Sequence, residues 1–328
     1  MKALVTGGGG FLGLAIVRKL RARGDDVRSF SRRTHPALEG LGVQSVRGDL
    51  ADRAAVLRAV RGRDIVFHVA AKAGVWGSTE SYHRANVVGT DNVLAACSTE
   101  GIERLVYTST PSVTFAGTDQ VGVDESAPYA SRYLSDYPRT KAIAERRVLE
   151  SNGANLASVA LRPHLIWGPG DPHLVPRILE RGRSGTLRLL GNQPNEVDSV
   201  YVDNAADAHL LAADRLAPGS AIAGKVYFIS QGEPLPLADL MNRILAAGDL
   251  PPVERRIPAG VAYFLGALLE TAYGLLGIET EPPLTRFVAA QLSTAHWFDI
   301  SAARRDLGYE PAVSLDEGME RLAASLRS

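Results

Sequence analysis

The sequence predicts an α/β fold in which a doubly wound parallel sheet is followed by a smaller, mostly helical lobe towards the C-terminus. Short apolar strands alternate with amphipathic helices over residues 1–162, as in repeated strand–helix–strand units. Beyond residue 162 the alternation loosens and prolines and glycines cluster, which marks a change of organisation. The chain has 328 residues, a length that suits one such core with an attached lobe.

Runs of apolar residues and their spacing place the individual elements. We expect strands at residues 2–6, 27–30, 43–47, 65–69, 104–108 and 158–162. Helices are expected at residues 13–23, 53–60, 86–97 and 136–150. Residues 200–202 and 226–229 should return to the sheet, and residues from about 231 to 296 should form the helical lobe. We therefore divide the chain into a sheet domain at 1–162, with returns near 198–230, and a lobe mainly within 163–328.

Composition and charge exclude several classes of protein. The chain carries 36 Lys and Arg against 36 Asp and Glu and has no Lys/Arg-rich tract, so we expect no nucleic-acid partner. Cys97 is the only cysteine, which excludes an internal disulfide and fits a reducing compartment. No metal site is predicted. The N-terminal residues do not resemble a secretory signal, and we expect a cytoplasmic protein.

One apolar segment qualifies the expected location. Residues 259–278 are almost wholly apolar and nearly long enough to span a membrane, but Glu270 and several glycines interrupt them. A buried helix, or a helix lying at a membrane interface, is favoured over a membrane span. The prediction is therefore a cytoplasmic protein, with peripheral attachment to a membrane as an addition to it.

A glycine-rich turn follows the first strand and opens the first helix. Gly7, Gly10 and Gly13 follow the spacing Gly-x-x-Gly-x-x-Gly, with Phe11 and Leu12 in the same turn. Glycine permits the tight turn, lets the backbone approach a pyrophosphate, and lets the helix pack closely on the strand. The helix N-terminus adds free N–H groups and a positive dipole. Because the motif lies between a strand and a helix, it predicts a Rossmann-type, dinucleotide-binding domain.

The end of the second strand predicts which nucleotide binds. A carboxylate about 20 residues beyond the glycines would hold the ribose 2′-hydroxyl of NAD. The chain instead has Ser31, Arg32 and Arg33 here, and the two guanidinium groups suit the 2′-phosphate of NADP. We therefore predict NADP(H) as the cofactor. The other predicted cofactor contacts follow the third and fourth strands and are Asp49, Leu50, Ala70, Ala71 and Lys72.

A Tyr-x-x-x-Lys pair carries the predicted chemistry. Tyr137 and Lys141 begin the helix that follows the fifth strand, in a chain that has few lysines. The i, i+4 spacing puts both side chains on one helix face, where the ammonium is expected to lower the pKa of the phenol. The phenol can then exchange a proton with a substrate while hydride moves at carbon. The alternative is an ordinary exposed pair on a helix surface.

A hydroxyl donor is expected beside this pair. Residues 107–112 end the fifth strand at the carboxyl edge of the sheet, where ligands bind in this architecture. We choose Thr110 and keep Ser109 as the alternative, because such a donor stabilises a developing alkoxide. The predicted catalytic residues are thus Tyr137, Lys141 and Thr110.

These residues resemble a known family over nearly the whole chain. The chain is similar to extended short-chain dehydrogenases/reductases, and among them to the 3β-hydroxysteroid and sterol-4α-carboxylate dehydrogenase group. The segments that carry the resemblance are residues 6–13, 86–93, 137–141, 161–171 and 197–205. It implies an oxidoreductase that forms a homodimer through helices 86–97 and 136–150, in which Tyr137 and Lys141 also touch the cofactor. The serine position of the family falls at Thr110.

Two further segments, residues 69–77 and 191–198, resemble a bacterial branch of this family that works in long-chain olefin biosynthesis. The resemblance implies reduction by NADPH of the 3-keto group of a long-chain 2-alkyl-3-oxo acid to the 3-hydroxy acid. It makes a long-chain apolar 3-keto acid the substrate and other enzymes of the same pathway candidate partners. The apolar segment 259–278 would then line a tunnel for alkyl chains or pack the core of the lobe.

Three alternatives stay open at this point. A sterol-type dehydrogenase running oxidatively with NAD would share the fold, although Arg32 and Arg33 argue against it. A non-catalytic NADP sensor typically loses the Tyr/Lys pair, which this chain keeps. A sugar-nucleotide epimerase would also look similar, but the lobe gives no clear signal for a nucleotide sugar. Fold alone does not decide between these functions.

Overall fold

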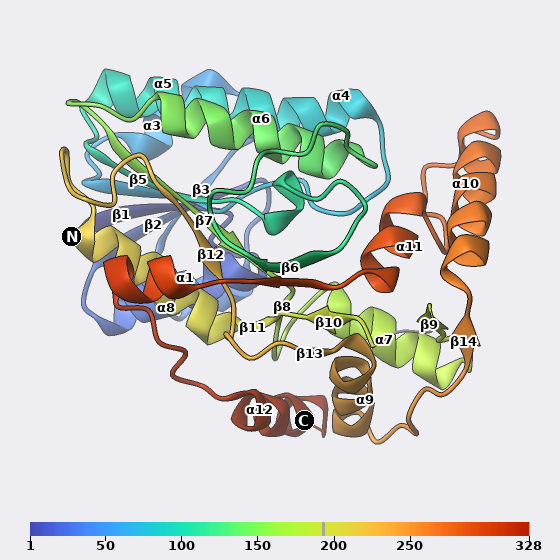
Figure 1. Ribbon diagram of the computed structural model, residues 1–328. Coiled ribbons are helices and arrows are strands. Elements are labelled where there is room, and N and C mark those ends of the chain that lie inside the picture. Colours follow the sequence, from blue (N-terminus) through green and yellow to red (C-terminus); the bar gives the residue numbers. More distant parts are fainter. Residues whose placement is uncertain (192–193, 328) are drawn as a thin grey trace.

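The computed structural model describes residues 1–191 and 194–327, and at its centre lies a parallel sheet of seven strands. The strand order is β12-β7-β5-β4-β1-β2-β3 (Figure 1). These strands are β1 (Lys2–Thr6), β2 (Asp26–Ser31), β3 (Gln44–Arg47), β4 (Ile65–His68), β5 (Arg104–Thr108), β7 (Ala157–Pro163) and β12 (Val226–Ile229). Because all of them are parallel, their carboxyl ends meet at one edge. The order reverses between β1 and β4, the place where open α/β sheets bind ligands.

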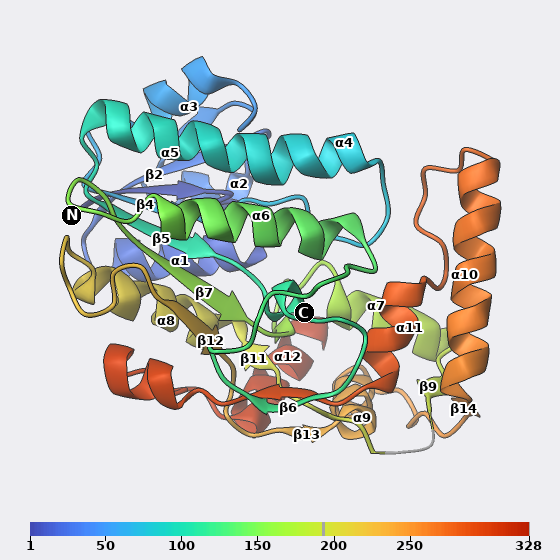
Figure 2. The same cartoon turned by 45° about the horizontal axis from the view of Figure 1, so that its top comes forward.

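Helices cover both faces of this sheet, as Figures 1 and 2 show. One face carries α3 (Arg53–Val60), α5 (Gly89–Glu100) and α6 (Asp136–Glu150), and the other carries α1 (Phe11–Ala22) and α8 (Val202–Arg215). Successive strand side chains point to opposite faces. Leu4 therefore packs with the α3 and α5 side, whereas Val5 packs with the α1 and α8 side. The predicted doubly wound α/β fold is confirmed.

The helix expected over residues 86–97 is the end of a longer helical stretch. It comprises α4 (Thr79–Tyr82), the π-helix η1 (His83–Val88) and α5. The stretch begins after Ser78, whose hydroxyl oxygen accepts a hydrogen bond from the Ser81 N–H at 3.2 Å. A further short helix, α2 (Pro36–Glu39), follows β2. Most other elements of the first half lie within two residues of their expected bounds.

The second half differs from the prediction in one strand and contains strands that the sequence did not indicate. β12 returns to the main sheet as expected, but β11 (Val200–Tyr201) pairs with β8 (Ile166–Trp167) in a separate ladder. The predicted return at residues 200–202 is therefore wrong. The second half also contains β9 (Leu189–Leu190), β10 (Glu196–Val197), β13 (Leu235–Pro236), β14 (Arg256–Ile257) and β15 (His296–Phe298), and the first half contains one further strand, β6 (Gln120–Val123). Strands this short display too little of the alternating period to be recognised.

The lobe combines several helices with a small second sheet. Its helices are α7 (Leu174–Arg183), α9 (Leu237–Ala247), α10 (Ala259–Leu275), α11 (Arg286–Ser293) and α12 (Leu315–Arg327), and the short helices η2 (Pro111–Val113) and η3 (Ala303–Leu307) lie elsewhere. The second sheet has the order β13-β10-β15-β6. It takes β6 from the first half of the chain, so the lobe is not built from residues after 162 alone. The division of the chain into two domains stays a prediction.

Helix α10 buries two of its small residues and exposes several of its large ones. Ala262 and Gly266 are its buried residues, and α10 packs on α11. A Cβ at Gly266 would lie 2.7 Å from the carbonyl carbon of Thr285, so only glycine permits this close approach. Phe264, by contrast, is 67% exposed. Of the alternatives for this segment, the helix buried in the lobe core is therefore wrong, and the helix at a membrane interface stays a prediction. Among the described residues, no helix is long and apolar enough to cross a membrane.

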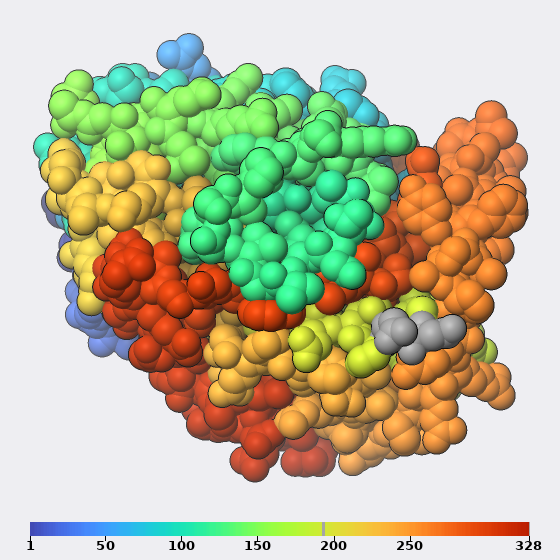
Figure 3. All heavy atoms as spheres, viewed as in Figure 1, coloured from blue at the N-terminus to red at the C-terminus, as the bar shows by residue number. Residues whose placement is uncertain are grey.

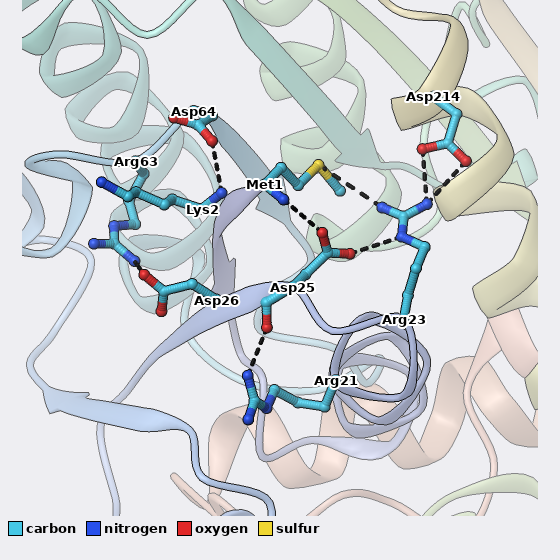
Figure 4. A network of polar contacts seen from close by, with 9 residues as sticks. All are labelled: Met1, Lys2, Arg21, Arg23, Asp25, Asp26, Arg63, Asp64 and Asp214. Carbon is cyan, nitrogen blue, oxygen red and sulfur yellow. Dashed lines mark hydrogen bonds and ion pairs between the residues drawn. The ribbon is translucent and has the colours of Figure 1, made fainter.

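The amino-terminal edge of the sheet is tied together by a network of charges (Figure 4). The N-terminal ammonium of Met1 lies 2.6 Å from Asp25, and the Arg23 guanidinium lies 2.7 Å from the same carboxylate. Arg23 also bonds Asp214 of α8 at 2.7 Å. The network thus joins the start of β1, the end of α1 and the end of α8, at the edge opposite to the carboxyl ends of the strands.

Candidate active site

The predicted cofactor contacts come together on the carboxyl edge of the sheet. They follow or end β1 (Gly7, Gly10, Phe11, Leu12, Gly13), β2 (Ser31, Arg32, Arg33), β3 (Asp49, Leu50) and β4 (Ala70, Ala71, Lys72). These four strands are neighbours in the order β4-β1-β2-β3. Groups that lie far apart in the sequence therefore line one continuous edge.

The glycine turn is packed so closely that two of its positions admit no side chain. Gly7 has a φ of 71°, and a Cβ there would lie 3.0 Å from the Cα of Ala70. A Cβ at Gly13 would lie 2.1 Å from the carbonyl oxygen of Gly7. Gly10 precedes α1 and offers no side chain to cap its first N–H groups. These features fit a dinucleotide whose pyrophosphate lies at the start of α1.

Three arginines gather where β2 and β3 end. Arg32 and Arg33 are exposed directly after Ser31, whose hydroxyl donates to the carbonyl oxygen of Arg33 at 2.7 Å. Arg47 is paired with Ser31 in the β2–β3 register, and its Nε donates to the carbonyl oxygen of Arg32 at 3.2 Å. The sequence analysis missed Arg47, which ends the predicted strand 43–47 but whose place beside Ser31 depends on the register of two strands.

Asp49 and Leu50 line the same edge one strand further out. The Asp49 carboxylate accepts from the N–H of Ala51 at 2.9 Å and lies 3.7 Å from an Arg84 guanidinium nitrogen. Leu50 packs against Gly89, where a Cβ would lie 2.8 Å from the Leu50 Cβ. Glycine at this position therefore lets the start of α5 approach Leu50 closely.

A buried polar network fixes the turn that follows β4. The hydroxyl of Thr6 accepts from two backbone N–H groups after β4, each at 3.1 Å, and lies 2.8 Å from Nδ1 of His68. The other ring nitrogen of His68 lies 3.0 Å from the Thr90 hydroxyl. Burial, aided by the nearby charge of Lys141, lowers the pKa of His68 to about 3. The ring is therefore neutral and acts as a support for the turn.

Asn86 links this turn to the helix that carries the Tyr/Lys pair. Its Oδ1 accepts from the N–H of Lys72 at 2.7 Å, and its Nδ2 donates to the Lys72 carbonyl at 3.1 Å and to the Thr140 hydroxyl at 3.0 Å. The Lys72 ammonium turns to the Ser81 hydroxyl, at 2.5 Å. The sequence reasoning assigned Asn86 no role, because a single buried amide leaves no periodic signal.

Tyr137 and Thr110 meet at the carboxyl end of β5. Tyr137 lies in the first turn of α6, and Thr110 caps η2 directly after β5. Burial raises the pKa of Tyr137, while a hydrogen bond with the Thr110 side chain opposes that rise. The expected lowering of this pKa by Lys141 is therefore wrong. A phenol that stays protonated is suited to donate a proton.

Ser109, the alternative donor, lies in a different environment from Thr110. Its N–H donates to the Leu161 carbonyl at 2.6 Å, so its backbone belongs to the sheet edge. Its buried hydroxyl has no hydrogen-bond partner in the part of the chain that the structure describes. Of the two hydroxyls, the one of Thr110 is in contact with Tyr137.

Lys141 is buried one turn along α6 from Tyr137, and is 2% exposed. Its ammonium donates to the Thr108 carbonyl at 2.6 Å and lies 4.1 Å from the centre of the Tyr107 ring. Burial lowers the pKa of Lys141 to about 7, although Glu145 works in the opposite direction. The charge of this side chain therefore titrates near neutral pH.

A buried ion pair lies one turn beyond Lys141. Arg162 on β7 approaches both oxygens of Glu145, with Nη2 at 2.5 Å and Nε at 3.0 Å. The Tyr129 hydroxyl donates to the same carboxylate at 2.7 Å. Both charged side chains are almost fully buried. This pair was not predicted, since its members are far apart in the sequence and belong to different elements.

An apolar cluster lies beside the catalytic residues, where the lobe meets the sheet domain. Phe115 and Phe287 meet edge to face, with ring centres 6.1 Å apart. Leu134, three residues before Tyr137, and Val75 from the loop after β4 pack against them. Helix α11 supplies Phe287, so this cluster joins the lobe to the segments that follow β4 and β5.

Comparison with known proteins is consistent with this geometry. The model of the 3-beta hydroxysteroid dehydrogenase/isomerase family matches residues 4–257. The chain belongs to this family. The predicted resemblance to extended short-chain dehydrogenases/reductases, and with it the oxidoreductase class, is confirmed.

Relatives of this family member match it from end to end. A protein of Stenotrophomonas maltophilia named 2-alkyl-3-oxoalkanoate reductase is 58% identical, with 99% of both chains covered. The sterol-4-alpha-carboxylate 3-dehydrogenase of Mus musculus is 35% identical and covers 99% of this chain and 90% of its own. Both predicted groups are therefore among its relatives. Of the segment 191–198, Asn192 and Gln193 lie outside the described residues.

Solved structures share the fold at lower identity. MoeE5 in complex with UDP-glucose and NAD is 25% identical with a TM-score of 0.78, covering 100% of this chain and 99% of its own. The UDP-glucose 4-epimerase of Thermus thermophilus, complexed with NAD, is 27% identical with a TM-score of 0.74, at the same coverage. Both confirm the Rossmann-type architecture of this family member.

Proposed function

We propose that this enzyme reduces the 3-keto group of a long-chain 2-alkyl-3-oxoalkanoate to a hydroxyl group, with NADPH, in long-chain olefin biosynthesis. The observation that carries the proposal is the 58% identity, over the full length, to a protein named 2-alkyl-3-oxoalkanoate reductase. The related alternative is a 3β-hydroxysteroid or sterol-4α-carboxylate dehydrogenase that uses NAD. Its support is more distant, at 35% identity.

A nicotinamide dinucleotide fits the glycine turn, and two fold relatives at 25% and 27% identity were solved with NAD. The choice of NADP rests on the charges at the ends of β2 and β3. Ser31 stands where NAD enzymes place a carboxylate, and Arg32, Arg33 and Arg47 surround it. Guanidinium groups form strong paired hydrogen bonds with phosphate, so these side chains would hold the 2′-phosphate.

The catalytic step needs a hydride, a proton and a group that stabilises the oxygen. Bound NADPH supplies the hydride to the carbonyl carbon. Tyr137 donates its phenolic proton to the carbonyl oxygen, and Thr110 donates a hydrogen bond to the same oxygen. Protonated Lys141, one helical turn away, stabilises the phenolate that remains after the transfer.

The apolar cluster at the lobe junction supports a substrate with long alkyl chains. Val75, Leu134 and Val288 are its partly buried members and would form an apolar wall for the substrate, whereas Phe115 and Phe287 are buried. An alkyl chain lying along this wall leaves water, with a gain of about 0.8 kcal/mol for each buried CH₂ group. The keto group then lies between this wall and the sheet edge.

We also propose a homodimer in the cytoplasm that works at a membrane surface with other enzymes of the same pathway as partners. The dimer would pair through α5 and α6, which an ion pair between Asp91 and Arg147 joins into one surface. Light scattering tests the dimer. The expected mass is twice the 35.0 kDa of one chain, and a monomer would contradict it.

The reaction is tested by a substrate panel. The enzyme is mixed with NADPH or NADH and a 2-alkyl-3-oxo acid, a 3-ketosteroid or UDP-glucose, while nicotinamide absorbance is followed. We expect NADPH oxidation with the oxo acid, and a product that has gained two hydrogens by mass spectrometry. Turnover confined to the steroid would favour the sterol alternative. Binding of NADPH without turnover of any substrate would favour a sensor.

A further inference from the structure

The outer face of α10 is a continuous apolar stripe. Val261, Phe264, Leu268 and Leu275 are 48%, 67%, 56% and 84% exposed. Their spacing of three, four and seven residues places them on one side of the helix. The opposite side packs on α11. Figure 3 shows the orange segment that contains α10 at the margin of the molecule, with its outer side uncovered.

This distribution of apolar and charged residues is the reverse of that in an ordinary surface helix, which buries its apolar stripe and exposes its charged residues. The helix has one charged residue, Glu270, and that carboxylate bonds both the backbone N–H and the guanidinium of Arg286. The hydroxyl of Thr271 donates to the Ala267 carbonyl at 2.8 Å. The side chains of Glu270 and Thr271 are thus engaged within the protein, and the stripe of Val261, Phe264, Leu268 and Leu275 offers apolar contact alone.

Basic residues flank the start of α10. Arg255 and Arg256 are exposed on the segment that leads into the helix. Arg188 precedes β9, the strand that pairs with β14, and therefore lies beside them. Glu254 is the acidic residue of the same segment. Three arginines against one glutamate make this a positively charged patch. An apolar helix face with a cationic flank is the pattern of helices that lie on anionic lipid surfaces.

The helix also borders the candidate active site. Trp76, from the loop after β4, donates its indole N–H to the Ile278 carbonyl at 3.0 Å, and its ring meets Tyr273 edge to face. The neighbouring Val75 belongs to the apolar cluster beside Tyr137. Apolar residues therefore connect the end of α10 with the wall next to the catalytic residues.

We propose that the outer face of α10 docks on the surface of an anionic lipid bilayer and lies in the interface without spanning it. This inference rests on the proposed function, because a substrate with two long alkyl chains resides in such a bilayer and would enter the site from it. Protein interfaces carry about one hydrogen bond per 100–200 Å². The stripe of Val261, Phe264, Leu268 and Leu275 has no side-chain donor or acceptor, which favours lipid over a protein partner.

The test is cosedimentation of the full-length enzyme with vesicles. One set contains phosphatidylcholine alone, and the other contains phosphatidylcholine and phosphatidylglycerol in equal parts. We expect the wild type to bind the anionic vesicles. The double variant Phe264→Asp/Leu268→Asp should bind them with an affinity lower by about tenfold or more. The matched control is Val121→Asp, at an apolar residue of β6 that is 59% exposed, and it should bind as the wild type does.

The charge contribution is tested separately with Arg255→Glu/Arg256→Glu. This variant should bind several-fold less to the anionic vesicles and show the same binding as the wild type to neutral ones. Turnover of a short-chain, water-soluble 2-alkyl-3-oxo acid should be unchanged in the Phe264→Asp/Leu268→Asp variant. Vesicle binding without turnover by the wild type would reject the reductase function and leave the docking surface intact.

Three results would overturn the docking proposal. The first is a wild type that does not bind anionic vesicles, and the second is a Phe264→Asp/Leu268→Asp variant that binds them equally well. The third is a halved mass of that variant in light scattering, which would show that a second copy of the chain covers the face.

Discussion

Both edges of the central sheet hold a buried ionisable group, but the pKa of that group shifts for a different reason at each edge. At the amino-terminal edge, burial would raise the pKa of Asp25, yet the N-terminal ammonium and Arg23 bond its carboxylate and hold its pKa below the ordinary value. At the carboxyl edge, Lys141 donates to the carbonyl of Thr108, and burial lowers its pKa to about 7. One edge thus pairs its charge, and the other keeps a group that titrates near working pH.

This difference separates stability from chemistry. A buried charge with a partner stabilises the folded state over the pH range in which it is ionised. A buried charge without an opposite partner destabilises the fold, and proteins retain such groups chiefly where a reaction needs a tuned pKa. Substitutions of unpaired groups at the carboxyl edge should therefore change rate more than stability, and substitutions of paired groups at the amino-terminal edge should do the reverse.

The largest effect is expected for Tyr137→Phe, which removes the proton donor. We expect kcat with a 2-alkyl-3-oxo acid to fall by about 10²–10⁴. NADPH affinity and the free energy of unfolding should stay nearly unchanged, because the ring still packs in place. Steady-state kinetics, fluorescence titration with NADPH and urea unfolding measure the three quantities.

Thr110→Val is the companion of this variant, since it removes the hydroxyl that contacts Tyr137 and keeps the shape of the side chain. A fall in kcat that resembles the loss of an oxyanion donor, about 10²–10³, is expected. If Ser109→Ala were the more damaging change, the assignment of the donor would move to Ser109. A Tyr137→Phe enzyme that keeps more than about a third of its kcat would reject Tyr137 as the donor.

Glu145→Gln tests a residue that affects both the stability of the fold and the pKa of Lys141. Glu145 forms a buried pair with Arg162 and also favours the charged form of Lys141. Removing one partner of such a pair should lower the free energy of unfolding by about 3–5 kcal/mol. Without the carboxylate, the pKa of Lys141 should fall further, because burial is then opposed by less negative charge.

The pH profile of kcat/KM reports the expected change in the pKa of Lys141. If the Lys141 ammonium is needed, kcat/KM of the wild type should fall as pH rises through about 7, where the ammonium loses its proton. In Glu145→Gln the fall should begin at lower pH. A profile that is identical in both proteins would show that Glu145 acts on stability alone.

Arg32→Ala should weaken NADPH binding by about 1–3 kcal/mol, the worth of a charge-assisted contact. NADH affinity should not change, since NADH lacks the 2′-phosphate. Arg47→Ala should reduce NADPH affinity in the same direction, and its effect separates a three-arginine site from a pair. Equal affinities of the wild type for NADPH and NADH would contradict the cofactor assignment.

The sequence predicted most reliably what local pattern determines. The strand–glycine turn–helix at residues 2–22 and the helix with Tyr137 and Lys141 each carry their signal within a few neighbouring residues. Arg47 lay outside the prediction because its role depends on strand register, which a single strand does not encode. The pairing of β6 with β15 likewise joins segments far apart in the chain.

One error and one open alternative came from properties that only packing determines. The pKa of Tyr137 depends on how deeply the phenol is buried, and the i, i+4 spacing to Lys141 carries no information on burial. For α10, apolar residues indicate that the segment avoids water, but not whether protein or lipid covers it. Gly266 fits the close packing on α11 and leaves the large side chains outside, which composition alone did not reveal.

The smallest expected effect is a loss of stability at the amino-terminal edge. It tests whether that edge serves stability and not catalysis. Asp25→Asn should lower the free energy of unfolding by about 1 kcal/mol at neutral pH, since the amide keeps part of the hydrogen bonding and loses the charge. In the wild type, the folded pKa of Asp25 lies below its ordinary value of 3.8. Its stabilisation is therefore complete above that value and is lost as pH falls through the folded pKa.

Urea unfolding at a series of pH values should show that the free energies of unfolding of the two proteins converge in acid, with kcat equal throughout. A gap that persists in acid, or a loss of kcat without a loss of stability, would mean that this edge does not serve stability alone.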